Sequence, residues 1–388
     1  MLEKTVPCTA ARASKPPSVW RAKKGISMKR AQSGLLTTKM SRRAALRAGI
    51  GGVIAAPFVL RAPDARSATS VVFGTYGGSY GEALKRIFFQ PFAKETGIQV
   101  IQTAPADMAK LRAQVQSKSP EWDVIELIPS ECVTAARMGL VMPLDFGKID
   151  IPELSVPEAK QTHWLSTYNY TTGIGYNSAK FPAGKHPETW ADFWDVQKFP
   201  GRRSLRSRPD NVLEIALLAD GVAPSAMYPL DVPRAFKALD RIKPHIAKWA
   251  DTAPQSIELI QTNDVDFTHT FNNRVFAAQS SGVPVAFNTE QLMMAFPAFA
   301  LPTGAANAEA GMRLLGYMMK PDLQAELWKA LRLIPVTKAA SALIPEAERK
   351  AWFPDLTTGK HLALNAEWWG ADGRLAEVTT QYRNWLLR

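Results

Sequence analysis

The residues with the clearest chemical potential form a glycine-rich turn at 77–81 (GGSYG), between a strand-like run at 71–73 and a helical pattern of apolar residues. A helix that begins directly after such a turn aims its free N–H groups at the turn, which suits a carboxylate or another polar ligand group. The alternative is an ordinary strand-to-helix turn without a ligand. The candidate ligand-binding residues in this turn are Tyr76, Gly77, Gly78, Ser79 and Tyr80.

A second chemistry that fits this turn is hydrolysis. The segment matches G-x-S-x-G, the pattern around the nucleophile of many serine hydrolases, with Ser79 in the nucleophile's place. However, no earlier strand supplies an oxyanion loop, and none of the five histidines stands in a recognisable partner context. We therefore expect a binding protein and no enzyme, with a periplasmic serine hydrolase as the alternative of another class.

Metal and cofactor chemistry have no matching pattern in the sequence. The histidines and cysteines lack the spacing typical of metal ligands. There is also no P-loop and no dinucleotide-binding fingerprint with its later acidic residue. The sequence therefore predicts neither a metal site nor a cofactor.

Two further sets of polar residues stand where predicted strands pass into predicted helices. Segment 207–211 (SRPDN) offers a serine, a guanidinium and an amide, and segment 271–274 (FNNR) offers a similar set. Each residue also has a structural interpretation, as a surface charge, a core aromatic or a helix cap. The additional candidate ligand-binding residues are Ser130, Arg208, Asn211, Phe271, Asn272 and Arg274.

The elements that would position these residues alternate along the chain. Strands are expected at 71–73, 98–102 and 122–127, with helices between them. Such alternation implies a mostly parallel sheet that binds ligands beyond the carboxyl ends of its strands, so the loops at 76–80 and 129–131 should face one crevice. Strand 168–177 then carries the chain into a second α/β series. Later elements include helices at 190–194, 209–219, 232–249 and 272–278, strands at 203–207, 265–270, 283–287 and 298–301, and helices at 306–319, 322–331 and 373–387.

The net charge of +12 is concentrated at the start of the chain. Residues 1–67 hold 14 of the 47 lysines and arginines but only Glu3 and Asp64 of the 35 acidic residues, which leaves 33 of each sign for the rest. The remainder is thus electroneutral, and we expect no nucleic-acid partner.

The start of the chain resembles a twin-arginine export signal. Segment 41–47 (SRRAALR) precedes a thirteen-residue apolar run at 48–60, and 65–67 (ARS) supplies a small-x-small cleavage site after Ser67. The run is too short to span a bilayer as an anchor. We therefore expect an N-terminal extension with signal peptide at 1–67, a periplasmic protein, and no membrane insertion after cleavage. The upstream residues 1–39 are either an extension or the product of a misassigned start, with Met40 or Met28 as the true one.

Over residues 69–388, the chain resembles a periplasmic solute-binding protein of an ABC importer, of the spermidine/putrescine-binding type. The resemblance rests on the order of FGTYGGSYGEA, WDVIEL with GLVMPLD, TTGIGYNSAKFP, FNNR and FALPTGAANAEAG. It implies the α/β fold of periplasmic binding proteins of type II, with two lobes joined by crossover strands and a ligand cleft between them. The lobes are expected at 69–174 with 297–335 and at 175–296 with 336–388. The implied partners are a small solute and an inner-membrane permease, and the protein is expected to be a monomer.

Departures from the family pattern bear on the ligand. Polyamine-binding members carry acidic side chains at three places where this chain has Gly77 with Gly78, Arg274 and Pro297. Arginines suit a carboxylate, so we expect an amino-acid-like or other carboxylate-bearing solute such as γ-aminobutyrate. A polyamine is the alternative. It would bind an acidic residue such as Glu131, Asp210 or Glu214.

The twin-arginine assignment predicts that replacing Arg42 and Arg43 by lysine stops export, because the transporter reads the arginine pair itself. Cell fractionation should find uncut precursor in the cytoplasm. Unchanged export of the double variant would contradict the assignment.

Overall fold

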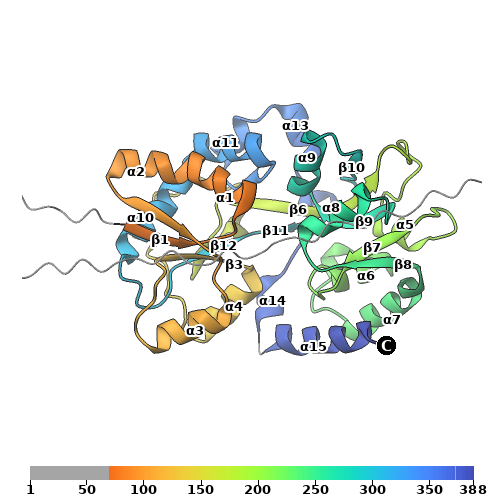
Figure 1. Ribbon diagram of the computed structural model, residues 1–388, viewed down its shortest axis with the longest axis horizontal. Helices are drawn as coiled ribbons and strands as arrows, with labels where there is room; N and C mark the ends of the chain where they lie inside the picture. The colour runs from red at the N-terminus through yellow and green to blue at the C-terminus, as the bar shows by residue number, and fades with distance from the viewer. Residues whose placement is uncertain (1–69, 372) are drawn as a thin grey trace, which may run out of the picture. The chain divides into compact units, whose positions relative to one another are not determined.

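The computed structural model describes residues 70–371 and 373–388, which are arranged about two β-sheets (Figure 1). The predicted extension and signal peptide, 1–67, therefore lie outside the described residues. The first sheet has the strand order β2-β1-β3-β12-β5-β4. The second has the order β14-β11-β6-β9-β7-β8, and β10 and β13 also pair with β6.

Both sheets mix parallel and antiparallel strands. In the first, β1 is parallel to β2 and β3, and in the second, β7 is parallel to β8 and β9. The strands of the first sheet are β1 (Ser70–Gly74), β2 (Gln99–Thr103), β3 (Val124–Leu127), β4 (Lys160–Gln161), β5 (Trp164–Leu165) and β12 (Ala298–Ala300). Those of the second are β6 (Tyr168–Asn177), β7 (Arg203–Arg206), β8 (Ile246–Ala250), β9 (Phe267–Phe271), β10 (Val285–Phe287), β11 (Met293–Ala295), β13 (Ile334–Pro335) and β14 (Leu362–Ala363).

Helices follow most strands. A single π-helical turn, η1 (Lys85–Phe89), joins α1 and α2. The helices are α1 (Gly78–Leu84), α2 (Gln90–Thr96), α3 (Met108–Gln116), α4 (Pro129–Arg137), α5 (Trp190–Trp194), α6 (Val212–Ala219), α7 (Val232–Ile242), α8 (Ala253–Gln261), α9 (Asn272–Ser280), α10 (Ala308–Met318), α11 (Pro321–Leu331), α12 (Lys338–Ala342), α13 (Glu346–Trp352), α14 (Ala366–Gly370) and α15 (Arg374–Leu386).

The chain passes between the sheets at two neighbouring places. It leaves β5 through Ser166 and Thr167 to enter β6, and it leaves β11 through Phe296 and Pro297 to enter β12. The Ser166 hydroxyl donates a hydrogen bond to the Pro297 carbonyl oxygen, which ties the two crossings together. In Figure 1, β6 and β11 run between the two groups of helices. Crossover strands were predicted and are confirmed, whereas the sequence limits given for the two lobes stay a prediction.

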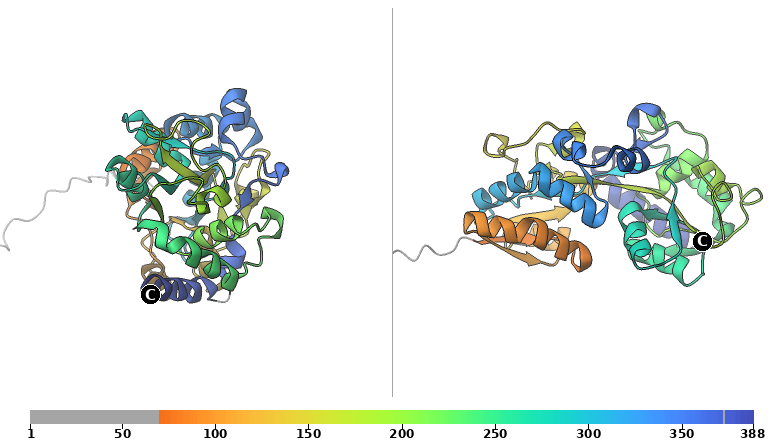
Figure 2. Two further views of the ribbon diagram at one scale, coloured as in Figure 1. Left: turned by 90° about the vertical axis from the view of Figure 1, so that its right-hand side faces the viewer. Right: turned by 90° about the horizontal axis from the view of Figure 1, so that it is seen from above.

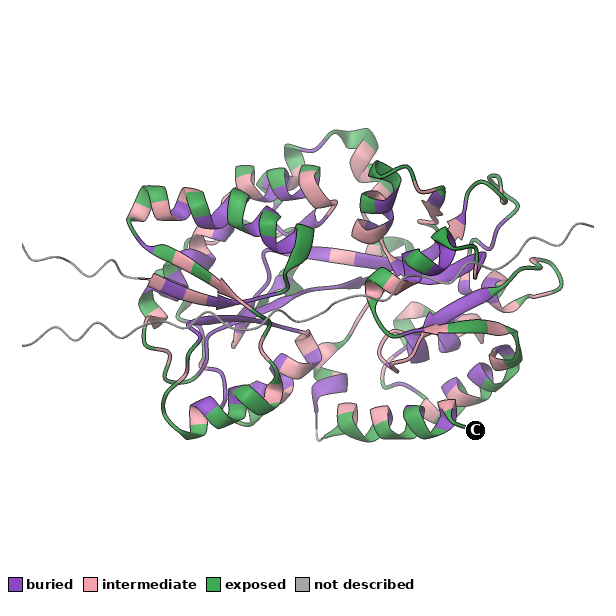
Figure 3. Ribbon diagram, viewed as in Figure 1, coloured by how far each residue is buried: buried purple, intermediate pink, exposed green. Residues whose placement is uncertain are grey.

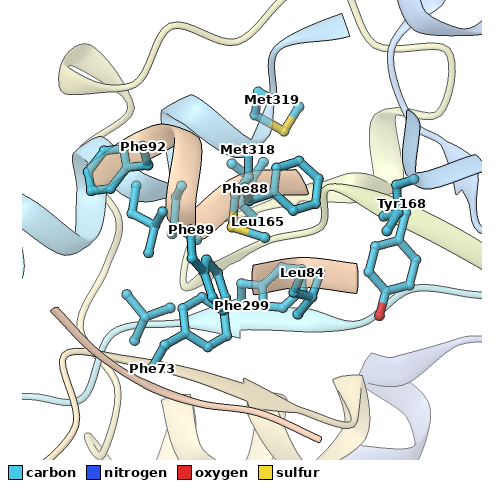
Figure 4. Close-up of a cluster of buried hydrophobic side chains, with 14 of the residues drawn as sticks. Phe73, Leu84, Phe88, Phe89, Phe92, Leu165, Tyr168, Phe299, Met318 and Met319 are labelled. Carbon is cyan, nitrogen blue, oxygen red and sulfur yellow. The ribbon is translucent and has the colours of Figure 1, made fainter. Parts of the chain in front are cut away.

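Each sheet has its own hydrophobic core. Around the first, aromatic side chains from β1, η1, α2 and β12 meet Met318 at the end of α10 and Met319 after it, as Figure 4 shows. The α1–α2 segment lies beside α10 and α11, orange and blue in Figure 2, and Phe92 contacts Tyr317 there with ring centroids 5.3 Å apart. The second core includes Trp190, Phe267 and Tyr382, all fully buried. Figure 3 shows the crossover strand β6 buried along most of its length, while the helices expose their outer faces.

One predicted element is wrong. The helix expected at 232–249 ends at Ile242, and Ile246–Ala250 forms strand β8 beside β7. Pro244 explains the break, because proline lacks the N–H that a helix needs and clashes with the preceding turn. Strand β6 and helix α5 have the limits predicted for them, at 168–177 and 190–194.

Helix α14 packs closely on α4 through a glycine. A Cβ atom on Gly370 would lie 2.5 Å from both the Ser130 carbonyl oxygen and the Val133 Cβ. Real Cβ atoms essentially never approach so closely, and one of these neighbours is backbone, which cannot turn away. The α4–α14 contact therefore requires glycine at this position.

We predict that Gly370→Ala lowers the free energy of unfolding by about 1 to 3 kcal/mol, because overpacking forces backbone to shift. Gly316→Ala in α10 is the matched control, since its Cβ meets nothing nearer than 3.4 Å. The control should be unchanged or up to about 1 kcal/mol more stable, as alanine favours helix. Urea unfolding of both variants checks this, and equal stabilities would contradict it.

Candidate functional site

Four strand-to-helix junctions carry the residues singled out in the sequence. They join β1 to α1, β3 to α4, β7 to α6 and β9 to α9. At each, the helix begins within a few residues of the carboxyl end of a strand with a parallel neighbour. This is where open α/β sheets bind ligands.

A buried carboxylate lies beneath the first junction. Glu126 on β3 is only 4% exposed, and Thr75 donates a hydrogen bond to its Oε2. The Tyr80 hydroxyl donates to Glu126 Oε1 over 2.9 Å. The Tyr168 hydroxyl, on the crossover strand β6, lies 3.1 Å from Oε1 and 2.8 Å from the Tyr80 hydroxyl. Glu126 thus connects the turn, α1 and β6.

Burial raises the pKa of the Glu126 carboxyl to about 7, while hydrogen bonds from Thr75, Tyr80 and Tyr168 and from the Tyr76 backbone oppose that shift. No cation is among the causes. The carboxyl is therefore stabilised by uncharged hydrogen-bond donors, which stabilise a buried carboxylate less than a cation would.

Two predicted site residues use their polar atoms inside the protein. Tyr80 is 8% exposed and donates to Glu126, so it supports the turn from beneath and does not offer a free hydroxyl. Asn272 is fully buried. Its Oδ1 accepts from the Thr171 N–H, and its Nδ2 donates to the Arg332 carbonyl oxygen. Tyr80 and Asn272 thus direct these polar atoms at partners within the protein, and their contact with a ligand stays a prediction.

The rest of the glycine-rich turn faces solvent. Tyr76 is 44% exposed, and Gly77, Gly78 and Ser79 are exposed as well. Gly78 has φ of +68°, a conformation that other residues rarely adopt. Ser79 has no hydrogen-bond partner among residues 70–371 and 373–388 and so has no base to activate it.

Three arginines lie at the junctions that join β7 to α6 and β9 to α9. Arg208 pairs with Asp210 over 2.5 Å. Arg206, which the sequence did not single out, donates a hydrogen bond to the Asp251 carbonyl oxygen, and its buried Nε has no hydrogen-bond partner among the described residues. Arg274, half-buried in the first turn of α9, has neither an ion pair nor a hydrogen bond to the described part of the chain. Burial lowers the pKa of Arg274, and the nearby Tyr168 opposes this.

Aromatic rings accompany these charges. Tyr170 on β6 and Phe271 at the end of β9 have ring centroids 5.8 Å apart, and the Arg206 guanidinium lies 5.6 Å from the Phe271 ring. Burial raises the pKa of Tyr170 to about 12, with Asp210 adding to the shift and Arg208 opposing it. These responses place Tyr170 near both charges. Neither Tyr170 nor Arg206 carries a local sequence signal, because the pairing of β6 with β9 brings Tyr170 to Phe271 and the pairing of β7 with β9 brings Arg206 there.

The acidic residues differ in what they bind. Burial raises the pKa of Glu131, and nearby Arg208 opposes this. Glu131 nevertheless makes no ion pair within the described ranges. Glu214 is fully buried, and its Oε1 accepts from Trp369 over 2.6 Å and from Tyr228 over 2.7 Å. Of the two, Glu131 is therefore the carboxylate left without a strong partner.

A cavity of about 320 Å³ adjoins this group. Ser130 and Asn211, from the second and third junctions, both line it, together with Tyr170 and Asp210. Asn211 adopts φ of +71° at the start of α6. The structure thus brings Ser130, Arg208 and Asn211 together, while Gly77, Gly78 and Ser79 lie outside the cavity lining.

Comparison with known proteins identifies the family. The family described as bacterial extracellular solute-binding protein matches residues 88–354. The chain belongs to this family. A γ-aminobutyric acid-binding protein of Pseudomonas aeruginosa is 30% identical over 322 residues, which cover 81% of this chain and 90% of the relative. The spermidine/putrescine-binding periplasmic protein of Escherichia coli is 24% identical over 307 residues, covering 76% and 85%.

A solved structure supports the same conclusion. An ABC transporter substrate-binding protein from Bradyrhizobium japonicum is 32% identical with a TM-score of 0.76, over 82% of this chain and 99% of that one. The predicted fold class, two α/β lobes of the type II binding-protein kind, is thereby confirmed. This solute-binding protein is a component of an ABC transporter that works with a membrane permease, and it is not an enzyme. Among the described residues, no helix is long and apolar enough to cross a membrane.

The raised pKa of Glu126 gives stability a predicted pH dependence. The folded state holds the proton up to pH about 7, whereas an unfolded glutamate loses it near about 4.3, so stability falls between these values and is flat above them. Glu126→Gln should remove roughly 3 kcal/mol of that fall. Urea unfolding at pH 4.5 and 7.5 measures it.

The control is Glu326→Gln, an exposed carboxylate on α11 paired with Lys329, which should leave the pH dependence unchanged. Parallel pH profiles for the wild-type protein and Glu126→Gln would contradict the assignment of the proton to Glu126.

Proposed function

We propose that this protein captures a small amino-acid-like solute, with one carboxylate and one ammonium group, in the periplasm and delivers it to the inner-membrane permease of an ABC importer. It acts as a monomer. The proposed ligand-binding residues are the candidates from the sequence that lie at the four junctions. Tyr170, Arg206 and Glu131 join them in this proposal.

The observation that carries the proposal is that two half-buried ions of opposite sign each lack an ion pair among the described residues. Arg274 and Glu131 are both half-buried, and neither makes an ion pair with the described residues. Half-buried ions without partners are costly, and a ligand with the opposite charges supplies what each lacks. Arginine binds a carboxylate in a fixed two-pronged geometry, and the Tyr76, Tyr170 and Phe271 rings suit an ammonium group or a short carbon chain.

The Pseudomonas aeruginosa relative, named for γ-aminobutyric acid, supports a ligand of this class. A polyamine is the second candidate because the Escherichia coli relative is named for spermidine and putrescine. Each ammonium group of a polyamine needs its own anion. However, Asp210 is already paired with Arg208, and Glu214 is held by Trp369 and Tyr228. The charge balance therefore favours the amino-acid-like solute.

We predict that Arg274→Ala weakens γ-aminobutyrate binding by about 2 kcal/mol or more, roughly 30-fold, because the ligand carboxylate loses its buried partner. Isothermal titration calorimetry measures this. Arg234→Ala is the matched control, since Arg234 pairs with Asp220 on the surface, and its affinity should stay within about twofold of wild type.

Putrescine provides the opposing result. Tight putrescine binding that is unchanged in Arg274→Ala, with no γ-aminobutyrate binding in the wild-type protein, would overturn the proposed function in favour of a polyamine.

A further inference from the structure

The cavity beside the charged residues is lined in part by buried aromatic side chains. Its walls include Ile128 before α4, Trp164 of β5, Phe296 at the crossing and Trp369 of α14. Trp164, Phe296 and Trp369 are between 3% and 6% exposed. The Trp369 indole N–H is already bound to Glu214, so this residue offers the cavity mainly carbon surface. Glu158, Gln161, Asn365 and Glu367 also line the cavity, so the aromatic rings offer an apolar group one part of the walls and polar side chains occupy the rest.

The size of the cavity exceeds what a simple amino acid fills. An apolar cavity of about 150 Å³ is enough to hold one benzene molecule. The volume here is about 320 Å³. A group of about the size of a phenyl ring therefore fits within it. Empty apolar volume forfeits contacts that a larger ligand would gain.

Two residues connect the cavity with the charged site. Tyr170 lines the cavity and also contacts the Phe271 ring. Asp210 lines it and holds Arg208 in place. Tyr170 and Asp210 thus border both the cavity and the residues that would bind the charged groups of the ligand.

We propose that the solute of this protein carries an apolar group of about the size of a phenyl ring in addition to its ammonium and carboxylate groups, and that this group fills the cavity lined by Trp164, Phe296 and Trp369. The proposal rests on the proposed function, because the charged end of the same ligand must bind the arginines and Glu131. It identifies the substrate class as amino acids with a bulky apolar substituent.

Calorimetry with four probes tests this: γ-aminobutyrate, and γ-aminobutyrate with a phenyl ring on carbon 2, on carbon 3 or, as a benzyl group, on nitrogen. At least one substituted probe should bind the wild-type protein tenfold or more tightly than γ-aminobutyrate, because the ring buries apolar surface. Ala366→Leu, which fills the cavity from α14, should abolish that advantage and leave γ-aminobutyrate within twofold.

Ala376→Leu, on the exposed face of α15, is the matched control and should keep the advantage. If Ala366→Leu also loses γ-aminobutyrate, Ala363→Leu on β14 fills the same cavity and replaces it. The inference is wrong, although the proposed function stands, if γ-aminobutyrate binds and no ring improves it, or if the advantage survives in the filled variants. Binding of putrescine alone would overturn both.

Discussion

The hydrogen bonds around Glu126 fix the parts of the molecule on which the binding site depends. Thr75 in the turn, Tyr80 on α1 and Tyr168 on the crossover strand all direct hydroxyl groups at one carboxyl. A buried carboxyl that lost these partners would destabilise the fold by about 1 to 3 kcal/mol or more, so the three elements are held in one arrangement. The turn after β1 and strand β6 are thereby fixed relative to β3, and Tyr170 follows Tyr168 toward the site.

The residues around the site show how a framework leaves charge available for a ligand. Asp210 pairs with Arg208, and Glu214 accepts hydrogen bonds from Trp369 and Tyr228. The side chain of Asn272 is bound to backbone groups. Arg274 and Glu131 have no such partners among the residues described. Leaving these two ions unpaired costs free energy in the free protein. An oppositely charged ligand group removes that cost, because each ion gains a partner without losing another, and this strengthens binding. The packing around the site therefore leads directly to the proposed choice of ligand.

Sequence reasoning succeeded where the signal was local. The β-branched and aromatic run at 168–177 gave β6 its observed limits, and helix α5 begins at a capping box of Thr189 and Asp192. The helix predicted at 232–249 failed because apolar spacing was weighed above Pro244. Glu126 was missed, although an acidic residue inside the buried strand WDVIEL was itself a signal. The role of α14 could not be predicted from the sequence, because the hydrogen bond that joins Thr134 to Gly370 connects residues 236 positions apart.

The central claim is that the site recognises two opposite charges on one small solute. Titration of the unmodified protein with γ-aminobutyrate, with butyrate and with butylamine tests it most directly, because the two analogues each lack one charge. We predict that both analogues bind at least about 30-fold more weakly, equivalent to about 2 kcal/mol for each lost charge partner. Butylamine or butyrate binding as tightly as γ-aminobutyrate would contradict recognition of two opposite charges.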